Sequence, residues 1–145
     1  MEHEIIAVSE FHEAFGVTNA DLPTLVKQEI GELRYKLMAE ENDEYLEAVK
    51  DENLVEIADA LGDQLYILCG TILTHGMQHV IEKVFNEIHA SNMSKLGPDG
   101  KPIYREDGKI LKGENYFKPN IKDLLWNKQD LKEWQKNKPK TYAFF

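Results

Sequence analysis

Apolar residues recur every three or four positions through the first two thirds of the chain, a spacing that places them along one side of an α-helix. Four such stretches are predicted as helices, at about residues 4–15, 23–50, 54–75 and 77–93. Helix-terminating residues separate them: Gly16 follows the first, Asp21 and Pro23 open the second, and Gly76 follows the third. Because the connections are short, the pattern predicts an all-α bundle of four to five helices.

The chain after Ser94 has a different composition. Residues 96–120 hold four of the nine glycines and three of the five prolines. Within them Asp107 and Gly108 lie between two short stretches, residues 103–106 and 109–112, an arrangement typical of a two-residue β-hairpin. A last short helix or tail is predicted at about residues 121–137. We therefore expect one all-α domain over residues 1–145, in which residues 95–145 form a basic extension with a small hairpin.

Composition favours a folded protein without disulfides or membrane spans. The chain is 42% hydrophobic and 30% charged, and its one cysteine, Cys69, lies in an apolar stretch, where we expect a small buried side chain. No basic segment followed by an apolar core opens the sequence, and the longest apolar run, residues 65–73, has about half the length of a membrane span. We expect a cytoplasmic protein with no membrane partner.

The net charge of −9 is concentrated in one segment. Residues 40–63 contain ten acidic residues and a single basic one, Lys50, whereas residues 95–140 contain twelve Lys and Arg against seven Asp and Glu. The basic segment raises nucleic-acid binding as a rival class. Its lysines are interleaved with acids and the whole chain is acidic, which opposes binding to a phosphate backbone, so we expect no nucleic-acid partner.

Two pairs of carboxylates stand out in the acidic segment. Glu41 and Glu44 are one helical turn apart on the second predicted helix, and Glu56 and Asp59 repeat that spacing on the third. The pairs are placed symmetrically about a chain reversal near Lys50. At ~1.5 Å per residue, Glu44 and Glu56 each lie ~9 Å from the reversal, so a helical hairpin brings the two pairs level.

Such a set of acids predicts a divalent metal site. Carboxylates that point between helices need a partner, and one lysine cannot neutralise ten acids. An all-oxygen ligand set favours Mg²⁺ or Mn²⁺, and no Glu has a His three residues later, as di-iron bundles require. A solvated acidic face on two surface helices is the alternative. The predicted metal ligands are Glu41, Glu44, Glu56 and Asp59.

The acidic segment carries a family resemblance. Residues 33–66 resemble the signature of the all-α nucleoside triphosphate pyrophosphohydrolases, the MazG-like group that includes dimeric dUTPases and phosphoribosyl-ATP pyrophosphohydrolase. The family pattern E-E-x-x-E, a variable gap and E-x-x-D falls on Glu40, Glu41, Glu44, Glu56 and Asp59. The flanking residues 8–17 and 87–119 also resemble stand-alone members of this superfamily, but less closely.

The resemblance implies hydrolysis of a (d)NTP at the α–β linkage, giving the monophosphate and pyrophosphate, in nucleotide-pool house-cleaning. It implies Mg²⁺, with Mn²⁺ as a possible substitute, held by the two carboxylate pairs, and a homodimer or dimer-based tetramer. Next to the two carboxylate pairs, we expect Glu40 to orient or deprotonate the attacking water. We expect Asp63 to support a metal ligand or to bind the metal itself. The alternatives are a phosphoribosyl-ATP pyrophosphohydrolase and a non-catalytic, metal-stabilised helical interaction module.

An acidic site also needs groups that bind the substrate. Basic and polar residues after the fourth helix are candidates for phosphate contacts, although most surface lysines only keep a protein in solution. The candidates are Asn92, Lys95, Arg105, Lys109 and Tyr116. Phe11, His12 and Phe15 on the first helix are candidates for one wall of a base pocket, with a core role as the alternative.

Overall fold

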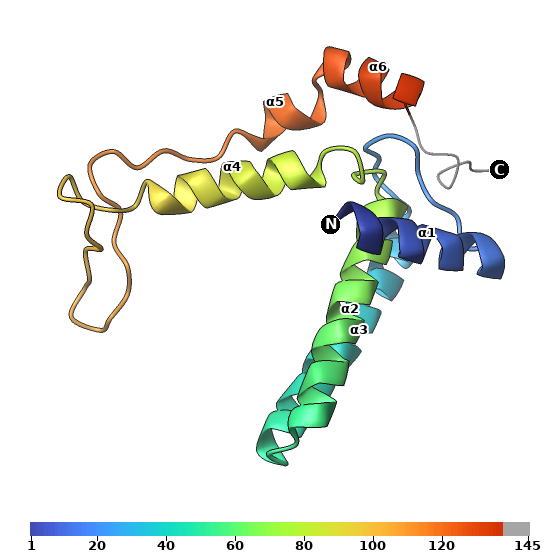
Figure 1. Ribbon diagram of the computed structural model, residues 1–145, viewed down its shortest axis with the longest axis horizontal. Coiled ribbons are helices and arrows are strands. Elements are labelled where there is room, and N and C mark those ends of the chain that lie inside the picture. The colour runs from blue at the N-terminus through green and yellow to red at the C-terminus, as the bar shows by residue number, and fades with distance from the viewer. Residues whose placement is uncertain (138–145) are drawn as a thin grey trace. The chain divides into compact units, whose positions relative to one another are not determined.

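The computed structural model describes residues 1–137, apart from the side chains of residues 128–131 and 134. Residues 138–145 of the predicted extension lie outside this description. The helices are α1 (Glu2–Phe15), α2 (Gln28–Lys50), α3 (Leu54–Thr74), α4 (Ile81–Met93), α5 (Ile121–Leu125) and α6 (Lys128–Asn137) (Figure 1). The all-α prediction is confirmed, and no helix in residues 1–137 combines the length and apolarity needed to cross a membrane.

Among the described residues the chain forms two compact units, one of residues 1–79 together with 133–137 and one of residues 80–132. In the first unit α2 and α3 run antiparallel, side by side, as a long hairpin (Figure 1). The chain reverses at residues 51–53, just after Lys50, near which the reversal was predicted. Asn53 caps α3 by accepting hydrogen bonds from Val55 N at 3.1 Å and Glu56 N at 3.3 Å. A side-chain cap of this kind stabilises a helix by about 1 kcal/mol. Because the reversal is centred on residue 52 and not on Lys50, Glu44 lies about 12 Å and Glu56 about 6 Å from it along the helices. The two carboxylate pairs are therefore offset by about one turn, and their predicted level placement is wrong.

Helix α1 packs on α3 near the end of the hairpin opposite the reversal. It ends at Gly16, which adopts the left-handed conformation with φ 69°, as predicted. Ile5 and Val8 are buried on its inner side, and on α3 Cys69 and Leu73 are fully buried. The expectation of a buried Cys69 is therefore confirmed.

The predicted start of the second helix at Pro23 is wrong, because α2 begins at Gln28. Residues 20–24 are instead held against the end of α3: Ala20 N donates to Leu73 O at 2.9 Å, and Thr24 N donates to His75 O at 3.0 Å. Gly76, with φ 66°, makes this close approach possible, since a Cβ there would lie 2.1 Å from Leu22 O. Backbone bonds to a distant segment thus prevail over a local helix signal.

The predicted start of the fourth helix at Met77 is also wrong, because α4 begins at Ile81. The residues before it complete the end of α3 instead: Gly76 N donates to Leu73 O and Met77 N donates to Ile72 O, at 3.1 and 3.0 Å. These two bonds satisfy carbonyl groups that the last turn of a helix leaves free. Residues 78–80 then form a turn.

The loop of the β-hairpin, predicted to consist of two residues, has three, residues 106–108. Arg105 N donates to Lys109 O at 2.8 Å, and Gly108, with φ 83°, closes the loop by donating to Arg105 O. A glycine in this conformation is what a three-residue loop requires at its third position. Pairing is limited to one bridge, Tyr104 with Ile110, so no strand forms in the described part of the chain.

In the second unit the segment after this loop returns alongside α4. Ser91 Oγ donates to Phe117 O at 2.9 Å, and Asn120 N donates to Glu87 Oε1 at 2.9 Å. Gly113 N donates to Lys95 O at 2.9 Å, and a Cβ at Gly113 would lie 2.2 Å from Leu96 O. The last predicted helix is two helices, because Trp126 and Asn127 interrupt it between α5 and α6.

A buried polar cluster joins α1, α2 and α3. His12 of α1 is 3% exposed and its Nδ1 is hydrogen-bonded to Asn19 Oδ1. Arg34 of α2 is 9% exposed, and it donates through Nε to Thr71 Oγ1 at 3.0 Å and through Nη2 to Ile67 O at 2.6 Å. Both side chains lie over Gly70 of α3, which provides the space for them.

We expect Gly70→Ala to lower the free energy of unfolding by about 1–3 kcal/mol. A Cβ at this position would lie 2.7 Å from Arg34 Nη2 and 3.1 Å from His12 Nε2, so the guanidinium would have to leave its two acceptors. Urea denaturation measures the change. Gly62→Ala is the matched control, because a Cβ there meets nothing within 4 Å and alanine favours a helix by up to about 1 kcal/mol. Equal effects of the two substitutions would contradict this account.

We also expect the first unit to lose stability in acid through His12. Burial, and then the charge of Arg34, lowers the pKa of His12, while its bond to Asn19 opposes the shift. A lowered pKa means that the unfolded chain takes up the proton more readily, so stability is full above about pH 6.5 and falls as the pH drops below that value. Urea midpoints at pH 7.5 and 5.5 measure this. His12→Gln should reduce the pH dependence, whereas His89→Gln, at an exposed position of α4, should leave it unchanged.

Candidate functional site

The acidic residues of the hairpin surround a cavity next to the chain reversal. Its volume is about 370 Å³. The cavity is lined by residues from both helices and the turn: Asp43, Glu44, Glu47, Ala48, Asp51, Asn53, Glu56 and Asp59. Three of the four predicted metal ligands, Glu44, Glu56 and Asp59, thus line one cavity.

The fourth predicted ligand, Glu41, lies in the seam between α2 and α3. Its side chain is half-buried, and Oε2 is shielded from solvent without any hydrogen-bond partner. Burial raises the pKa of Glu41, and the nearby charges of Glu44, Asp63, Glu40 and Asp59 raise it further. Glu41 is therefore a shielded acceptor among like charges, which is a costly arrangement unless a cation binds it.

Helical periodicity explains why Glu41 is the acid that faces α3. Arg34, Glu41 and Ala48 follow one another at seven-residue intervals, close to two helical turns, so they share one side of α2. Arg34 and Ala48 are buried. On α3, Gln64 reaches across the seam and donates from Nε2 to Glu41 O at 3.3 Å. Glu40, Glu44, Glu56, Asp59 and Asp63 are exposed.

The residues present fit a hard divalent cation. The donor atoms of the four predicted ligands are all carboxylate oxygens, and one of them, Glu41 Oε2, has no hydrogen-bond partner. Lys50, the one lysine of the acidic segment, forms an ion pair with Glu47 at 2.5 Å. Within residues 1–137, apart from the undescribed side chains, no three His, Cys, Asp or Glu side chains already meet at metal-binding distances. The carboxylates that face the cavity come from two facing helices, and side-chain rotation alone changes their separation.

The predicted phosphate contacts lie in the second unit, on α4 and the segment after it. Lys95 Nζ donates to Asn92 Oδ1 at 2.7 Å, which places these two candidates together one turn apart. Arg105 forms an exposed ion pair with Asp107 at 2.5 Å, and this pairing raises the pKa of Arg105 and lowers that of Asp107.

The other two candidates lie at the loop and beyond it. Lys109 N donates to Asp107 Oδ1 at 3.1 Å, while its side chain is exposed. Tyr116 is half-buried and its ring lies 4.2 Å from Lys112 Nζ, a cation–π contact. Of the five candidates, Asn92 and Lys95 are therefore the pair that the fold brings into direct contact.

The aromatic candidates of α1 separate into two groups. Phe11 and Phe15 are exposed and stacked, with ring centroids 4.3 Å apart, whereas His12 is buried in the cluster with Asn19 and Arg34. Tyr66 of α3 joins the exposed group, with its ring 5.8 Å from that of Phe11. Sequence reasoning missed Tyr66, although its position three residues after Asp63 places it on the acidic side of α3.

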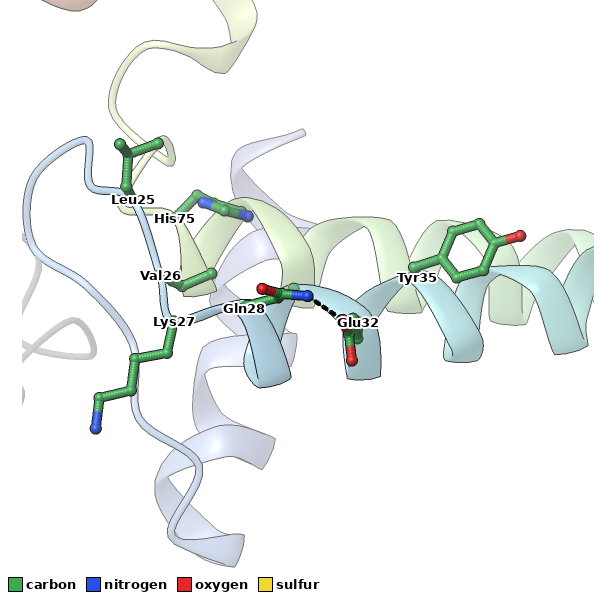
Figure 2. A pocket seen from close by; sticks show the side chains of 8 residues that line it. Leu25, Val26, Lys27, Gln28, Glu32, Tyr35 and His75 are labelled. Carbon is green, nitrogen blue, oxygen red and sulfur yellow. Dashed lines mark hydrogen bonds between the residues drawn. The ribbon is translucent and has the colours of Figure 1, made fainter.

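A second cavity lies where the extended segment before α2 joins that helix, and its volume is about 380 Å³. Figure 2 shows its lining side chains, with the hydrogen bond from Gln28 Nε2 to Glu32 Oε1, 2.6 Å long. Leu25, Val26 and Tyr35 supply much of the lining, beside His75. One glutamate and one lysine line it, so it lacks the converging carboxylates of the first cavity.

Comparison with known proteins agrees with the resemblance described above. The sequence model of the phosphoribosyl-ATP pyrophosphohydrolase family matches residues 8–92, which include most of α1 and all of α2 and α3. A crystal structure named a putative NTP pyrophosphohydrolase, from Exiguobacterium sp. 255-15, is 28% identical to the chain, with a TM-score of 0.47. The match covers 91% of this chain and 95% of that one. No curated protein gives a significant sequence match. The chain belongs to the phosphoribosyl-ATP pyrophosphohydrolase family, and its function is of the pyrophosphohydrolase type.

Proposed function

We propose that the protein is a Mg²⁺-dependent nucleoside triphosphate pyrophosphohydrolase. It cleaves a (d)NTP at the α–β linkage and releases the (d)NMP and pyrophosphate, as a nucleotide house-cleaning enzyme does. The observation that carries the proposal is Glu41 Oε2, a shielded oxygen without a hydrogen-bond partner among four neighbouring carboxylates. An arrangement of this kind is stabilised by a divalent cation, and a triphosphate is the ligand that such a cation recruits.

Glu41, Glu44, Glu56 and Asp59 hold Mg²⁺ or Mn²⁺ in this proposal. Glu44, Glu56 and Asp59 line the cavity and Glu41 Oε2 has no hydrogen-bond partner, so these four carboxylates would hold the ion. Bound Mg²⁺ would polarise the phosphate oxygens and lower the pKa of a bound water. Asp63, whose charge acts on Glu41, supports that ligand or adds another oxygen.

Glu40 is the proposed general base. It is exposed on α2 next to Glu41, and it lies outside the four ligands, so its carboxylate is available to a water molecule. The water oxygen attacks the α-phosphorus, its proton passes to Glu40, and the bond from the α-phosphorus to the bridging oxygen breaks. Pyrophosphate leaves with that oxygen.

Considered by itself, the second unit holds the side chains that we propose for phosphate contacts. Lys95, held by Asn92, offers an ammonium group, and Lys109 has an exposed one. Arg105 and Tyr116 are weaker candidates, because Asp107 and Lys112 already engage them.

Phosphoribosyl-ATP is the second candidate substrate. It is favoured by the description of the family whose model matches residues 8–92. A nucleoside triphosphate remains our first choice because residues 95–145 add a long basic extension to the helical core.

A substrate panel tests the proposal. The protein is incubated with Mg²⁺ and each of the common NTPs and dNTPs, dUTP and phosphoribosyl-ATP, and the products are identified by ³¹P NMR. We expect a monophosphate and pyrophosphate from at least one nucleoside triphosphate. Turnover confined to phosphoribosyl-ATP would favour the second candidate, and no turnover with retained Mg²⁺ binding would favour the non-catalytic module.

We further propose a homodimer or a dimer-based tetramer. Large apolar side chains of the hairpin are exposed on the single chain: Leu33, Leu54 and Val55 are 55%, 77% and 75% exposed. Apolar surface of this extent is typical of association sites. Light scattering after gel filtration should give at least twice 16.7 kDa, and a mass of one chain would contradict the proposal.

A further inference from the structure

We propose that Phe11, Phe15 and Tyr66 form a stacking platform for the nucleobase of the substrate. The term aromatic platform below means these three side chains. The inference rests on the proposed function for the identity of the ligand, because it places the base of the same nucleotide whose phosphates the acidic site would bind.

The aromatic platform is built from two helices. Phe11 and Phe15 lie one turn apart on α1, with ring centroids 4.3 Å apart and planes at 28°, which is a stacked pair. Tyr66 of α3 meets Phe11 edge to face, at 5.8 Å and 82°. Both geometries are favourable for aromatic pairs, so the three rings form one contiguous aromatic surface.

The aromatic platform is accessible. Phe15 is 70% exposed, Phe11 is 40% exposed and Tyr66 is 39% exposed, whereas Ile5 and Val8 of the same α1 helix are each 2% exposed. The core of α1 is therefore formed by other residues, and the three rings face outward. Exposed aromatic rings stack on the π-face of any nucleobase, which needs no matching hydrogen bonds.

The position of Tyr66 on α3 joins the aromatic platform to the acidic site. Asp59, Asp63 and Tyr66 follow one another at intervals of four and three residues, so they lie along one side of the helix. At ~1.5 Å per residue, Tyr66 lies ~4.5 Å beyond Asp63 and ~10.5 Å beyond Asp59 along the axis. A single ribose separates a base from its α-phosphate, so base and phosphates can occupy neighbouring turns of one helix.

Binding of a nucleoside tests the aromatic platform without phosphates or metal. Adenosine is titrated into the protein in EDTA, and binding is followed by saturation-transfer NMR, with ribose 5-phosphate as the ligand that lacks a base. We expect adenosine to bind and ribose 5-phosphate not to bind. Phe15→Leu and Tyr66→Leu, which keep an apolar side chain but remove the ring, should weaken adenosine binding by about 5–100-fold.

Matched variants separate stacking from a structural role. Tyr66→Phe keeps the ring and should bind adenosine as the unaltered protein does. Tyr35→Leu removes a ring that is 68% exposed on α2, at the second cavity, and should also leave binding unchanged. Circular dichroism should show the same melting temperature for Phe15→Leu and the unaltered protein.

The outcomes distinguish this inference from the proposed function. Adenosine that fails to bind, or that binds Phe15→Leu and the unaltered protein equally, overturns the aromatic platform even if triphosphates are hydrolysed. Adenosine binding that depends on both rings supports the platform even if no nucleotide is hydrolysed, and only the proposed function then fails. With an active enzyme, Phe15→Leu should raise KM by the same factor as the adenosine Kd while kcat stays within about twofold, since stacking acts equally on the bound substrate and the transition state.

Discussion

Glu40→Gln lowers kcat by about 10²–10⁴-fold, the range typical of losing a general base. The amide has the size of the carboxylate but cannot accept the proton of the attacking water. The four ligands Glu41, Glu44, Glu56 and Asp59 remain intact, so Mg²⁺ affinity should change by less than about threefold. Steady-state pyrophosphate release measures kcat, and isothermal titration measures Mg²⁺ binding.

Glu29→Gln is the matched control for this substitution. It removes one exposed carboxylate from the first turn of the same helix and should leave kcat unchanged. Turnover of Glu40→Gln near that of the unaltered protein would show that Glu40 is not the base, and a loss of Mg²⁺ binding would make it a ligand instead.

Mg²⁺ raises the melting temperature of the unaltered protein, and Asp59→Ala removes that rise. A cation at 100 times its Kd stabilises the folded state by about 2.7 kcal/mol, which corresponds to about 5–10 °C for a chain of this size. Asp59 supplies one of the oxygens that line the cavity, and its charge also acts on Glu41. Differential scanning fluorimetry in MgCl₂ and in EDTA measures both effects.

In EDTA, Asp59→Ala should instead raise the melting temperature of the protein. Without a cation the carboxylates repel one another: burial raises the pKa of Glu41, and the neighbouring charges, Asp59 among them, raise it further. Removing Asp59 relieves part of this repulsion and should raise the melting temperature slightly. NaCl at the ionic strength of the MgCl₂ solution is the control for screening. If NaCl reproduces the effect of MgCl₂, or if Asp59→Ala keeps the Mg²⁺ response, the metal site is not where we place it.

Local sequence signals predicted the hairpin and the concentration of acids beside its reversal. The two helical stretches on either side of the reversal and the three-residue spacing of each acid pair are properties of neighbouring residues. Within a helix, the spacing in the sequence fixes the direction of each side chain and its position along the helix axis. This is why three predicted ligands line one cavity beside the reversal.

The same signals failed where a distant segment competes for backbone hydrogen bonds. Pro23 is compatible with a helix start, but Ala20 and Thr24 donate to the carbonyls of Leu73 and His75, which lie about fifty residues away in the sequence. Helix propensity contributes only tenths of a kcal/mol per residue, so two tertiary hydrogen bonds outweigh it.

The sequence by itself determined that the chain is helical and where its acids concentrate, because periodicity and charge are properties of neighbouring residues. Only the tertiary structure decided that Glu41 lies in the seam, that His12 is buried beside Arg34, and that Tyr66 meets Phe11. Each of these facts depends on how helices from separate parts of the chain pack, and that packing is set by side-chain volume and hydrogen-bond partners that no local pattern contains.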